Sequence, residues 1–245
     1  AVADTPSLSV DAAAGSEDSA IALDITSALT DTDGSETLEV TLTGVPEGAT
    51  LSAGTVNEDG SVTLTPEQLD GLTITPAADS AEDFTLTVTA TSTDGSDTAT
   101  QTASLPVTVT GVADDATLET AAASGDEDTA IALDIDVTNV ADGDSASVTL
   151  TGVPEGATLS AGTVNDDGSV TLTTDQLDGL TITPAADSDA DFQLTVAVTT
   201  TDGDSGDTAT VTETLDVTVD AVADTPSLSV DAAAGSEDSA IALDI

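Results

Sequence analysis

The chain has 245 residues, of which 48 are Asp or Glu and none is Lys, Arg or His, so its formal net charge is −48. Without cationic side chains it cannot neutralise phosphates, which argues against nucleic acid and anionic membrane surfaces as partners. It also contains no Cys, Met, Trp or Tyr. The absence of His and Cys excludes zinc sites, thiol chemistry and histidine-based acid–base catalysis. No run of about 18 apolar residues is present that could cross a bilayer.

Apolar and polar residues alternate along several short segments, although so acidic a chain with so few aromatic residues could otherwise be disordered. The alternation is strict at residues 21–25, 38–42 and 84–89. A period of two over five or six residues indicates a strand with one buried face, and the abundance of Thr and Val fits such a strand. No period of 3.6 residues is sustained, so the sequence predicts an all-β protein.

The first part of the chain predicts seven strands separated by turns rich in Gly, Pro and Asp. A further short strand is expected at 50–53, between the third and fourth main strands, and a single helical turn at 66–69 joins the fourth main strand to the fifth. The middle of the unit is the hardest part to assign. In chain order the seven main strands cover residues 7–13, 21–27, 37–44, 61–65, 72–75, 84–91 and 99–110.

The sequence repeats itself with a period of about 110 residues, the usual size of a seven-stranded β-sandwich. Residues 1–25 recur without change at 221–245. We therefore expect immunoglobulin- or cadherin-like repeats at 1–110 and 111–220, and an N-terminal fragment of a third repeat at 221–245. The chain starts without the cationic region of a signal peptide and stops within the repeated pattern, so we expect it to be a piece of a longer protein.

The topology of a sandwich predicts where the acidic residues gather. Strand direction alternates, so the turn after the first strand, the loop before the sixth strand and the outgoing linker share one end of a repeat, where they meet two loops of the next repeat. The candidate metal ligands at the first junction are Glu17, Asp18, Asp79, Asp83, Asp114, Asp142, Asp144 and Asp202, and those at the second are Glu127, Asp128, Asp187, Asp191 and Asp224.

Clustered carboxylates need either water or a cation between them. Two carboxylates 4 Å apart repel by roughly 4 kcal/mol at an effective dielectric constant of 20, and the chain has no Lys or Arg to relieve this repulsion. Oxygen ligands from flexible loops suit Ca²⁺, which takes six to eight of them, whereas Mg²⁺ uses fewer protein ligands. We therefore predict Ca²⁺ at the junctions. The acidity also fits a salt-adapted surface that binds no metal.

The repeats resemble those of a known family. Residues 15–25 (GSEDSAIALDI) are similar to the opening of bacterial cadherin-like and immunoglobulin-like repeats. Residues 31–38 (DTDGSETL) and 44–54 (GVPEGATLSAG) resemble the extender repeats of giant RTX (long-repeat) adhesins. The resemblance implies β-sandwiches stiffened by Ca²⁺ at their linkers, in a protein exported by type I secretion to the bacterial cell surface for adhesion and biofilm formation. The Asp-x-Asn-Asp-Asn linker motif of cadherins is replaced here by residues 112–115 (VADD).

These observations predict a monomeric, extracellular rod whose partners are the neighbouring repeats of the same chain, with no small-molecule substrate. Its function would be to project a distal adhesive region from the cell. An alternative is a module that itself binds a carbohydrate or a solid surface through exposed Ser and Thr, although sugar sites generally use Trp and Tyr, which are absent. An enzyme, such as a glycosidase with paired carboxylates, is disfavoured because the acidic pairs recur with the repeat.

Overall fold

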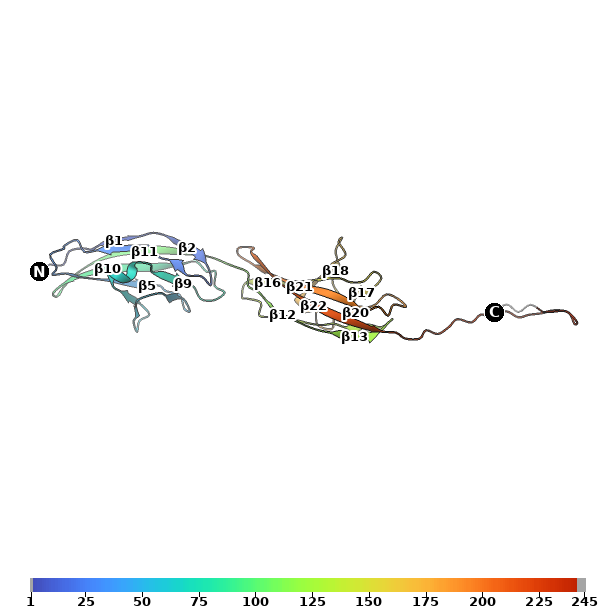
Figure 1. Cartoon of the computed structure of the whole chain (residues 1–245). Coiled ribbons are helices and arrows are strands. Elements are labelled where there is room, and N and C mark those ends of the chain that lie inside the picture. Colours follow the sequence, from blue (N-terminus) through green and yellow to red (C-terminus); the bar gives the residue numbers. More distant parts are fainter. Residues whose placement is uncertain (1, 242–245) are drawn as a thin grey trace.

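Two β-sandwiches follow one another along the chain in the computed structural model, which describes residues 2–241 (Figure 1). Strands β1 to β11 form the first sandwich, and strands β12 to β22 form the second. Residues 111–116 link the last strand of the first sandwich to the first strand of the second. No helix among the described residues is long and apolar enough to cross a membrane.

The first sandwich has eleven strands, because two of the seven predicted main strands are each divided into two and two short strands, β6 and β7, are added. Of these, β6 lies in the segment 50–53, where an extra strand was predicted. The predicted helical turn is also confirmed, as the 3-10 helix η1 (Pro66–Leu69). The strands are β1 (Ser7–Val10), β2 (Ala13–Ser16), β3 (Ile21–Ala22), β4 (Ile25–Ala28), β5 (Thr37–Thr43), β6 (Thr50–Leu51), β7 (Thr55–Val56), β8 (Val62–Leu64), β9 (Thr73–Thr75), β10 (Phe84–Asp94) and β11 (Asp97–Thr110).

These strands form one long sheet and a second layer. The long sheet has the order β2-β11-β10-β5-β8-β7, and the second layer consists of the pair β1-β4 and the three strands β3-β9-β6. Alternate residues of each strand point into the core. In β10, for example, Leu86, Val88 and Ala90 are fully buried while the Thr residues between them are not. The core joins residues of both layers, as the alternation predicts.

The first predicted strand, at residues 7–13, is divided between the two layers, and this is a correction to the sequence prediction. Its first part, β1, pairs antiparallel with β4, whereas β2 pairs parallel with β11. Asp11 lies at the crossing, where its backbone N–H donates to the carbonyl of Asp24 at 3.1 Å. Gly15 permits the close approach of β2 to β3, because a Cβ at this position would lie 2.7 Å from Cγ1 of Ile21. The strand predicted at 21–27 is also divided, into β3 and β4, which both lie in the second layer and pair with β9 and β1.

The second sandwich repeats this arrangement. Its long sheet has the order β13-β22-β21-β16-β19-β18, and β13 again pairs parallel with the last strand, β22. Its elements are β12 (Thr117–Ala121), β13 (Ala123–Asp126), β14 (Ile131–Ala132), β15 (Asp134–Thr138), β16 (Asp144–Thr151), β17 (Thr158–Leu159), β18 (Thr163–Val164), β19 (Val170–Thr173), η2 (Thr174–Gln176), β20 (Thr181–Thr183), β21 (Phe192–Asp202) and β22 (Thr208–Asp220).

The predicted fragment of a third repeat, residues 221–245, behaves differently. Its described part, residues 221–241, contains no strand and trails from the end of β22 (Figure 1). Residues 242–245 lie outside the described residues. The first strand that the repeat predicts at this place is therefore not formed within residues 221–241.

Candidate metal sites at the repeat junctions

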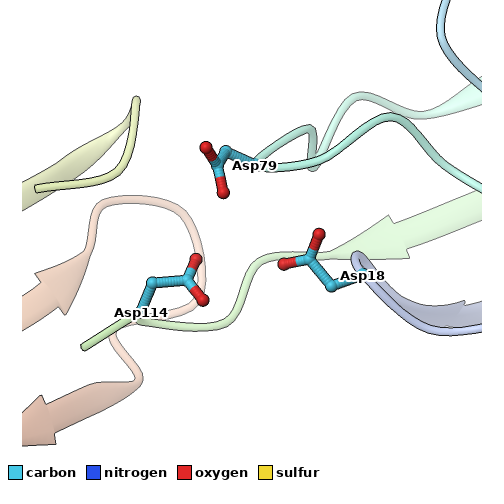
Figure 2. Close-up of side chains that lie close together, drawn as sticks. All are labelled: Asp18, Asp79 and Asp114. Atoms are coloured by element: carbon cyan, nitrogen blue, oxygen red, sulfur yellow. The ribbon is translucent and has the colours of Figure 1, made fainter. Parts of the chain in front are cut away.

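Three carboxylates from separate parts of the chain converge at the first junction. Asp18 lies in the turn between β2 and β3, Asp79 lies in the loop between β9 and β10, and Asp114 lies on the linker. Each offers one carboxylate oxygen, and these oxygens lie within 4.8 Å of one another. Figure 2 shows the three carboxylates facing a common space between the two sandwiches.

The backbone conformation of the two loops presents these side chains. Asp18 has a φ of 54° and Asp79 has a φ of 55°, so both are in the left-handed region. Asp is one of the few residues other than Gly that adopts this conformation readily. The strands β2 and β9 enter this end of the sandwich, and the turns that follow them bring the two carboxylates to the start of the linker.

Glu17, next to Asp18 in the sequence, holds the linker to the first sandwich by hydrogen bonds. Its backbone N–H donates to the carbonyl of Thr110 at 3.1 Å, and its Oε1 accepts from the N–H of Val112 at 2.8 Å. The side chain is 4 % exposed, and its Oε2 has no hydrogen-bond partner. Burial raises the pKa of Glu17, and the charges of Asp18, Asp202 and Asp114 raise it further, while the bond from Val112 lowers it.

Asp114 is the linker residue of the cluster and is itself half-buried. Its Oδ2 has no hydrogen-bond partner. Loss of hydration raises its pKa, and the negative charges of Asp18, Asp79 and Asp144 add to this effect. A carboxylate held in this position is therefore destabilised by its surroundings when it is ionised and no cation is near.

The second sandwich contributes two of its predicted residues to the same junction. Asp144 accepts a hydrogen bond at its Oδ2 from the N–H of Asp114, at 3.1 Å. Asp202 is 5 % exposed and packs against the linker so closely that a Cβ on Gly111 would collide with its carboxylate. Bonds from the side chain and backbone of Ser205 lower the pKa of Asp202, which favours its charged form.

Two further predicted residues of the first junction stand apart from the three-carboxylate group. Asp83 accepts a hydrogen bond at Oδ1 from the N–H of Val109, at 2.9 Å, so one of its oxygens is already used to hold β11. Asp142 is exposed in the loop between β15 and β16. Neither belongs to the group of converging carboxylates that the described residues form.

The second junction has the same plan with fewer contributors. Oxygens of Asp128, Asp187 and Asp224 lie within 4.8 Å of one another, and the N–H of Asp187 donates to Oδ1 of Asp128 at 3.1 Å. Glu127 accepts from the N–H of Val222 at 2.7 Å, in the manner of Glu17. The charge of Asp187 raises the pKa of Asp224, and smaller contributions come from burial, Asp128 and Glu127.

Asp191 at the second junction is equivalent to Asp83 at the first. Its Oδ1 accepts from the N–H of Val219 at 2.9 Å, as Asp83 does from Val109. The structure thus brings six of the thirteen predicted residues into two carboxylate groups, and gives four others, Glu17, Glu127, Asp83 and Asp191, a hydrogen bond to the outgoing chain. That these groups hold Ca²⁺ stays a prediction.

One buried acid was missed by the sequence prediction. Glu36 is 7 % exposed, its Oε1 accepts from the N–H of Asp4 at 2.7 Å, and its Oε2 has no partner. This bond matches the one from Asp114 to Asp144 at the first junction. The repeat offset could have identified it, because Glu36 and Asp144 are 108 residues apart, with Glu36 directly before β5 and Asp144 at the start of the equivalent strand β16.

Comparison with known proteins found similarity to solved structures. No family model and no curated protein matches the chain. A solved structure of Drosophila N-cadherin EC1-4 is 16 % identical, with a TM-score of 0.39; the match covers 89 % of this chain and 50 % of that one. The titin domains z1z2 in complex with telethonin are 14 % identical over 91 % of this chain and 100 % of that one, with a TM-score of 0.36.

The chain therefore spans about half the length of the N-cadherin fragment that it matches. The predicted fold class, tandem immunoglobulin- or cadherin-like β-sandwiches, is confirmed, and the strand pairing of the two sandwiches is the observation that carries it.

Proposed function

We propose that this chain is a spacer made of β-sandwich repeats, that Ca²⁺ at the junctions stiffens it, and that it belongs to a bacterial surface adhesin whose distal region binds the target. The repeat sequence and the succession of sandwiches support the spacer role. The resemblance to extender repeats supports the bacterial, extracellular setting, in which the neighbouring repeats are the partners of each repeat.

The observation that carries the proposal is the unpartnered buried oxygen of Glu17. A buried carboxylate oxygen without a hydrogen bond is costly, and it lies beside the converging carboxylates of Asp18 and Asp114 in a protein without Lys or Arg. A divalent cation would satisfy these oxygens together. The donor set fits Ca²⁺, because all donors are oxygens and most are carboxylates on turns and linkers.

The residues of the first junction come from all three parts that a bound cation would have to connect: the first sandwich, the linker and the second sandwich. Asp18 and Asp79 belong to the first sandwich, Asp114 belongs to the linker, and Asp144 and Asp202 hold the linker from the second sandwich. A cation bound by the first three would tie the linker to two loops of the first sandwich and would remove the repulsion among them. Binding to this folded arrangement would also stabilise folding where calcium is abundant.

The dimensions suit a spacer. Strand β10 has 11 residues, which span roughly 36 Å at about 3.3 Å per residue, so each sandwich adds a few nanometres along the chain. The absence of Lys and Arg also leaves no bond for trypsin-like proteases to cut, which favours survival outside the cell.

Thermal melting with and without calcium tests this proposal. At a free Ca²⁺ concentration of 100 Kd the gain is about 2.7 kcal/mol for one site, which corresponds to roughly 10–20 °C in Tm for a domain of about 100 residues. We expect Asp18→Asn to abolish most of the gain in the first sandwich. Asp70→Asn, an exposed acid outside the clusters, serves as the matched control. Superimposable curves in calcium and EDTA would contradict the proposal.

One observation favours the alternative, a module that binds a surface. Rows of Thr cross the exposed face of the long sheet, and one row joins Thr55, Thr63, Thr41, Thr89 and Thr102 in register. Such a row presents hydroxyl and methyl groups at the spacing of neighbouring strands, about 4.8 Å. Adsorption of the chain to polysaccharide and mineral surfaces, compared with a Thr89→Glu variant, would distinguish this role from that of a spacer.

A further inference from the structure

Strands β3 and β4 follow one another in the second layer of the first sandwich, but only β3 is paired on the edge that faces β9. The pairing ends with a bond from the N–H of Leu23 to the carbonyl of Leu72 at 2.9 Å. At Gly71 the backbone has a φ of 71°, a left-handed conformation that turns the chain away from this edge. Strand β4 therefore pairs with β1 alone, and its other edge has no partner strand among residues 2–241.

The backbone groups on this unpaired edge follow from the bonds on either side. The carbonyl of Asp24 accepts from the N–H of Asp11 on the β1 side, at 3.1 Å, whereas the N–H of Leu23 points to the β9 side. Successive residues of an antiparallel strand direct their N–H and C=O groups to opposite edges. The groups of Ile25 and Ser27 therefore point away from β1, and each of them can form a hydrogen bond to an added strand.

A groove of about 490 Å³ lies along the same edge. Strand β4 lines one side of it, and η1 and the residues that follow η1 line the other. Apolar side chains close the groove towards the core: Ile25, Leu69 and Leu72 line it and are 4 %, 6 % and 1 % exposed. At Gly71 the groove is unfilled, because no atom beyond the neighbouring residues lies within 4 Å of the position that a Cβ would take. The groove is thus open to a short extended segment.

The second sandwich has the same unpaired edge. The N–H of Leu133 donates to the carbonyl of Leu180 at 2.9 Å, and Gly179, with a φ of 70°, again turns the chain away. Strand β15 pairs with β12 alone among the described strands, so the backbone groups of Ile135 and Val137 point to a groove of about 410 Å³. The groove is therefore a product of the strand arrangement that the two sandwiches share.

The charge of the two edges indicates which kind of segment fits. Asp24 is exposed on the outer face of its strand, and Asp134 and Asp136 are exposed on the equivalent strand of the second sandwich. Directly opposite residues of antiparallel strands have Cβ atoms about 4.5–5.5 Å apart, close enough for an opposite charge to stabilise the pair. The chain has a net charge of −48 and no Lys or Arg to take this place. A basic segment is therefore favoured, whereas a second copy of the chain is repelled.

We propose that the free edges of β4 and β15 bind an extended polypeptide in which basic and apolar residues alternate, as an added antiparallel strand. Its apolar side chains face the groove opposite Ile25 and Ser27, and its basic side chains face outward beside the aspartates. In this mode of recognition main-chain hydrogen bonds supply affinity and alternate side chains supply specificity. The inference goes beyond the proposed spacer role. It is independent of calcium, because neither groove includes a junction residue.

Amide hydrogen exchange, measured by NMR on the full chain, tests this proposal with the peptide Lys-Val-Lys-Val-Lys as the probe. We expect the peptide to slow exchange at the N–H groups of Ser27 and Val137, by about tenfold when it is present at ten times its Kd. The N–H groups of Thr26 and Asp136 point to β1 and β12, so their exchange should not change.

The two repeats provide matched variants for the charge. Asp136 in β15 occupies the position of Thr26 in β4, 110 residues earlier. We expect the second groove to bind the peptide up to about fivefold more tightly than the first, because it offers one more opposite-charge pair. Thr26→Asp should remove this difference by strengthening the first groove, and Asp136→Thr should remove it by weakening the second. In each variant the other groove is the internal reference, and the new residue is one that the equivalent strand already carries.

Two further peptides separate strand addition from a general attraction to an acidic chain. Methylation of both Val backbone nitrogens leaves the charge of the probe intact but removes its donors, and should abolish the slowed exchange. Glu-Val-Glu-Val-Glu should not bind. Equal protection by the methylated peptide would overturn the proposal, as would unchanged exchange at Ser27 and Val137 with Lys-Val-Lys-Val-Lys. Equal protection by Glu-Val-Glu-Val-Glu would overturn the assignment of a basic partner.

Discussion

Residues 2–21 and 222–241 have the same sequence and different structures. In the first segment Leu8 and Val10 lie in β1 and are half-buried, and Ile21 is 2 % exposed. In the second, Leu228 and Val230 are 76 % and 63 % exposed, and no strand forms. The difference arises from partners: β1 pairs with β4 and β2 pairs with β11, whereas residues 222–241 have no paired strand among the described residues. Isolated strands are not stable in water.

The turn within the two segments is nevertheless the same. Asp18 has a φ of 54° and Asp238 has a φ of 58°, and residues 17–18 and 237–238 are both turns. A turn depends on neighbours within a few residues, whereas a strand depends on neighbours far away in the sequence. The turn in residues 15–20 therefore forms from local contacts alone, whereas the strands on either side of it form only when the rest of the sandwich is present.

The largest expected effect on stability concerns an isoleucine that occurs at the same place in both segments. Ile21→Ala should destabilise the first sandwich by about 2–5 kcal/mol, because it leaves a cavity between the two layers. Ile241→Ala, the same change in the same local sequence, should have almost no effect because Ile241 is 47 % exposed. Urea unfolding of the two variants measures both values. Similar losses in the two variants would show that residues 222–241 are packed in solution.

A second prediction compares the two junctions. At the first junction, Asp144 and Asp202 of the following sandwich lie beside the carboxylates. The second junction is followed by no strand among the described residues. We expect calorimetric titration to show two classes of calcium site whose affinities differ by about tenfold, or 1.4 kcal/mol. Asp18→Asn should remove the tighter class and Asp128→Asn the weaker one. A single class, lost equally in both variants, would contradict this assignment.

The smallest expected effect is a pH dependence in the absence of calcium. Burial and neighbouring charges raise the pKa of Glu17 and that of Asp114 above their ordinary values of 4.5 and 3.8. The folded state therefore holds more protons than the unfolded state between the ordinary and the raised values. In EDTA the first sandwich should gain stability as the pH falls through the raised values towards about 4.5, and lose it as the pH rises.

Two variants and an added ion check this pH dependence. Glu17→Gln should reduce the slope of unfolding free energy against pH, whereas Glu237→Gln, at the equivalent exposed position, should leave it unchanged. Saturating calcium should reverse the sign of the slope, because protons then compete with the bound ion. An identical slope in wild type and Glu17→Gln would contradict the assignment of the effect to Glu17.

Much of the fold could be predicted because each strand carries its own pattern. Strict alternation at residues 38–42 and 84–89 predicted β5 and β10, and the burial of Val40, Leu42, Leu86 and Val88 agrees with it. The alternating direction of successive strands predicted that Asp18, Asp79 and Asp114 lie at one end of the sandwich. This prediction requires only the number of strands between them. The structure brings these three together.

The division of the first predicted strand could not be seen in the same way. Residues 7–16 carry a weak alternation, and nothing within them shows that β1 joins one layer and β2 the other. The parallel pairing with β11 joins positions more than 90 residues apart. The repeat offset points to Glu36, but its hydrogen bond from Asp4 of the incoming chain, 32 residues away, is visible only in the tertiary structure.

The sequence by itself determined the features that depend on near neighbours or on composition: the period of the repeat, the alternation of strands, the turns at the aspartates and a surface without a single cation. The tertiary structure alone decided which strands became partners, which acids were buried, and that the first and last strands of each sandwich run side by side. The physical reason is that turns form from contacts a few residues apart, whereas a strand and a buried carboxylate are stable only when distant segments are already in place to pair with them and to exclude water.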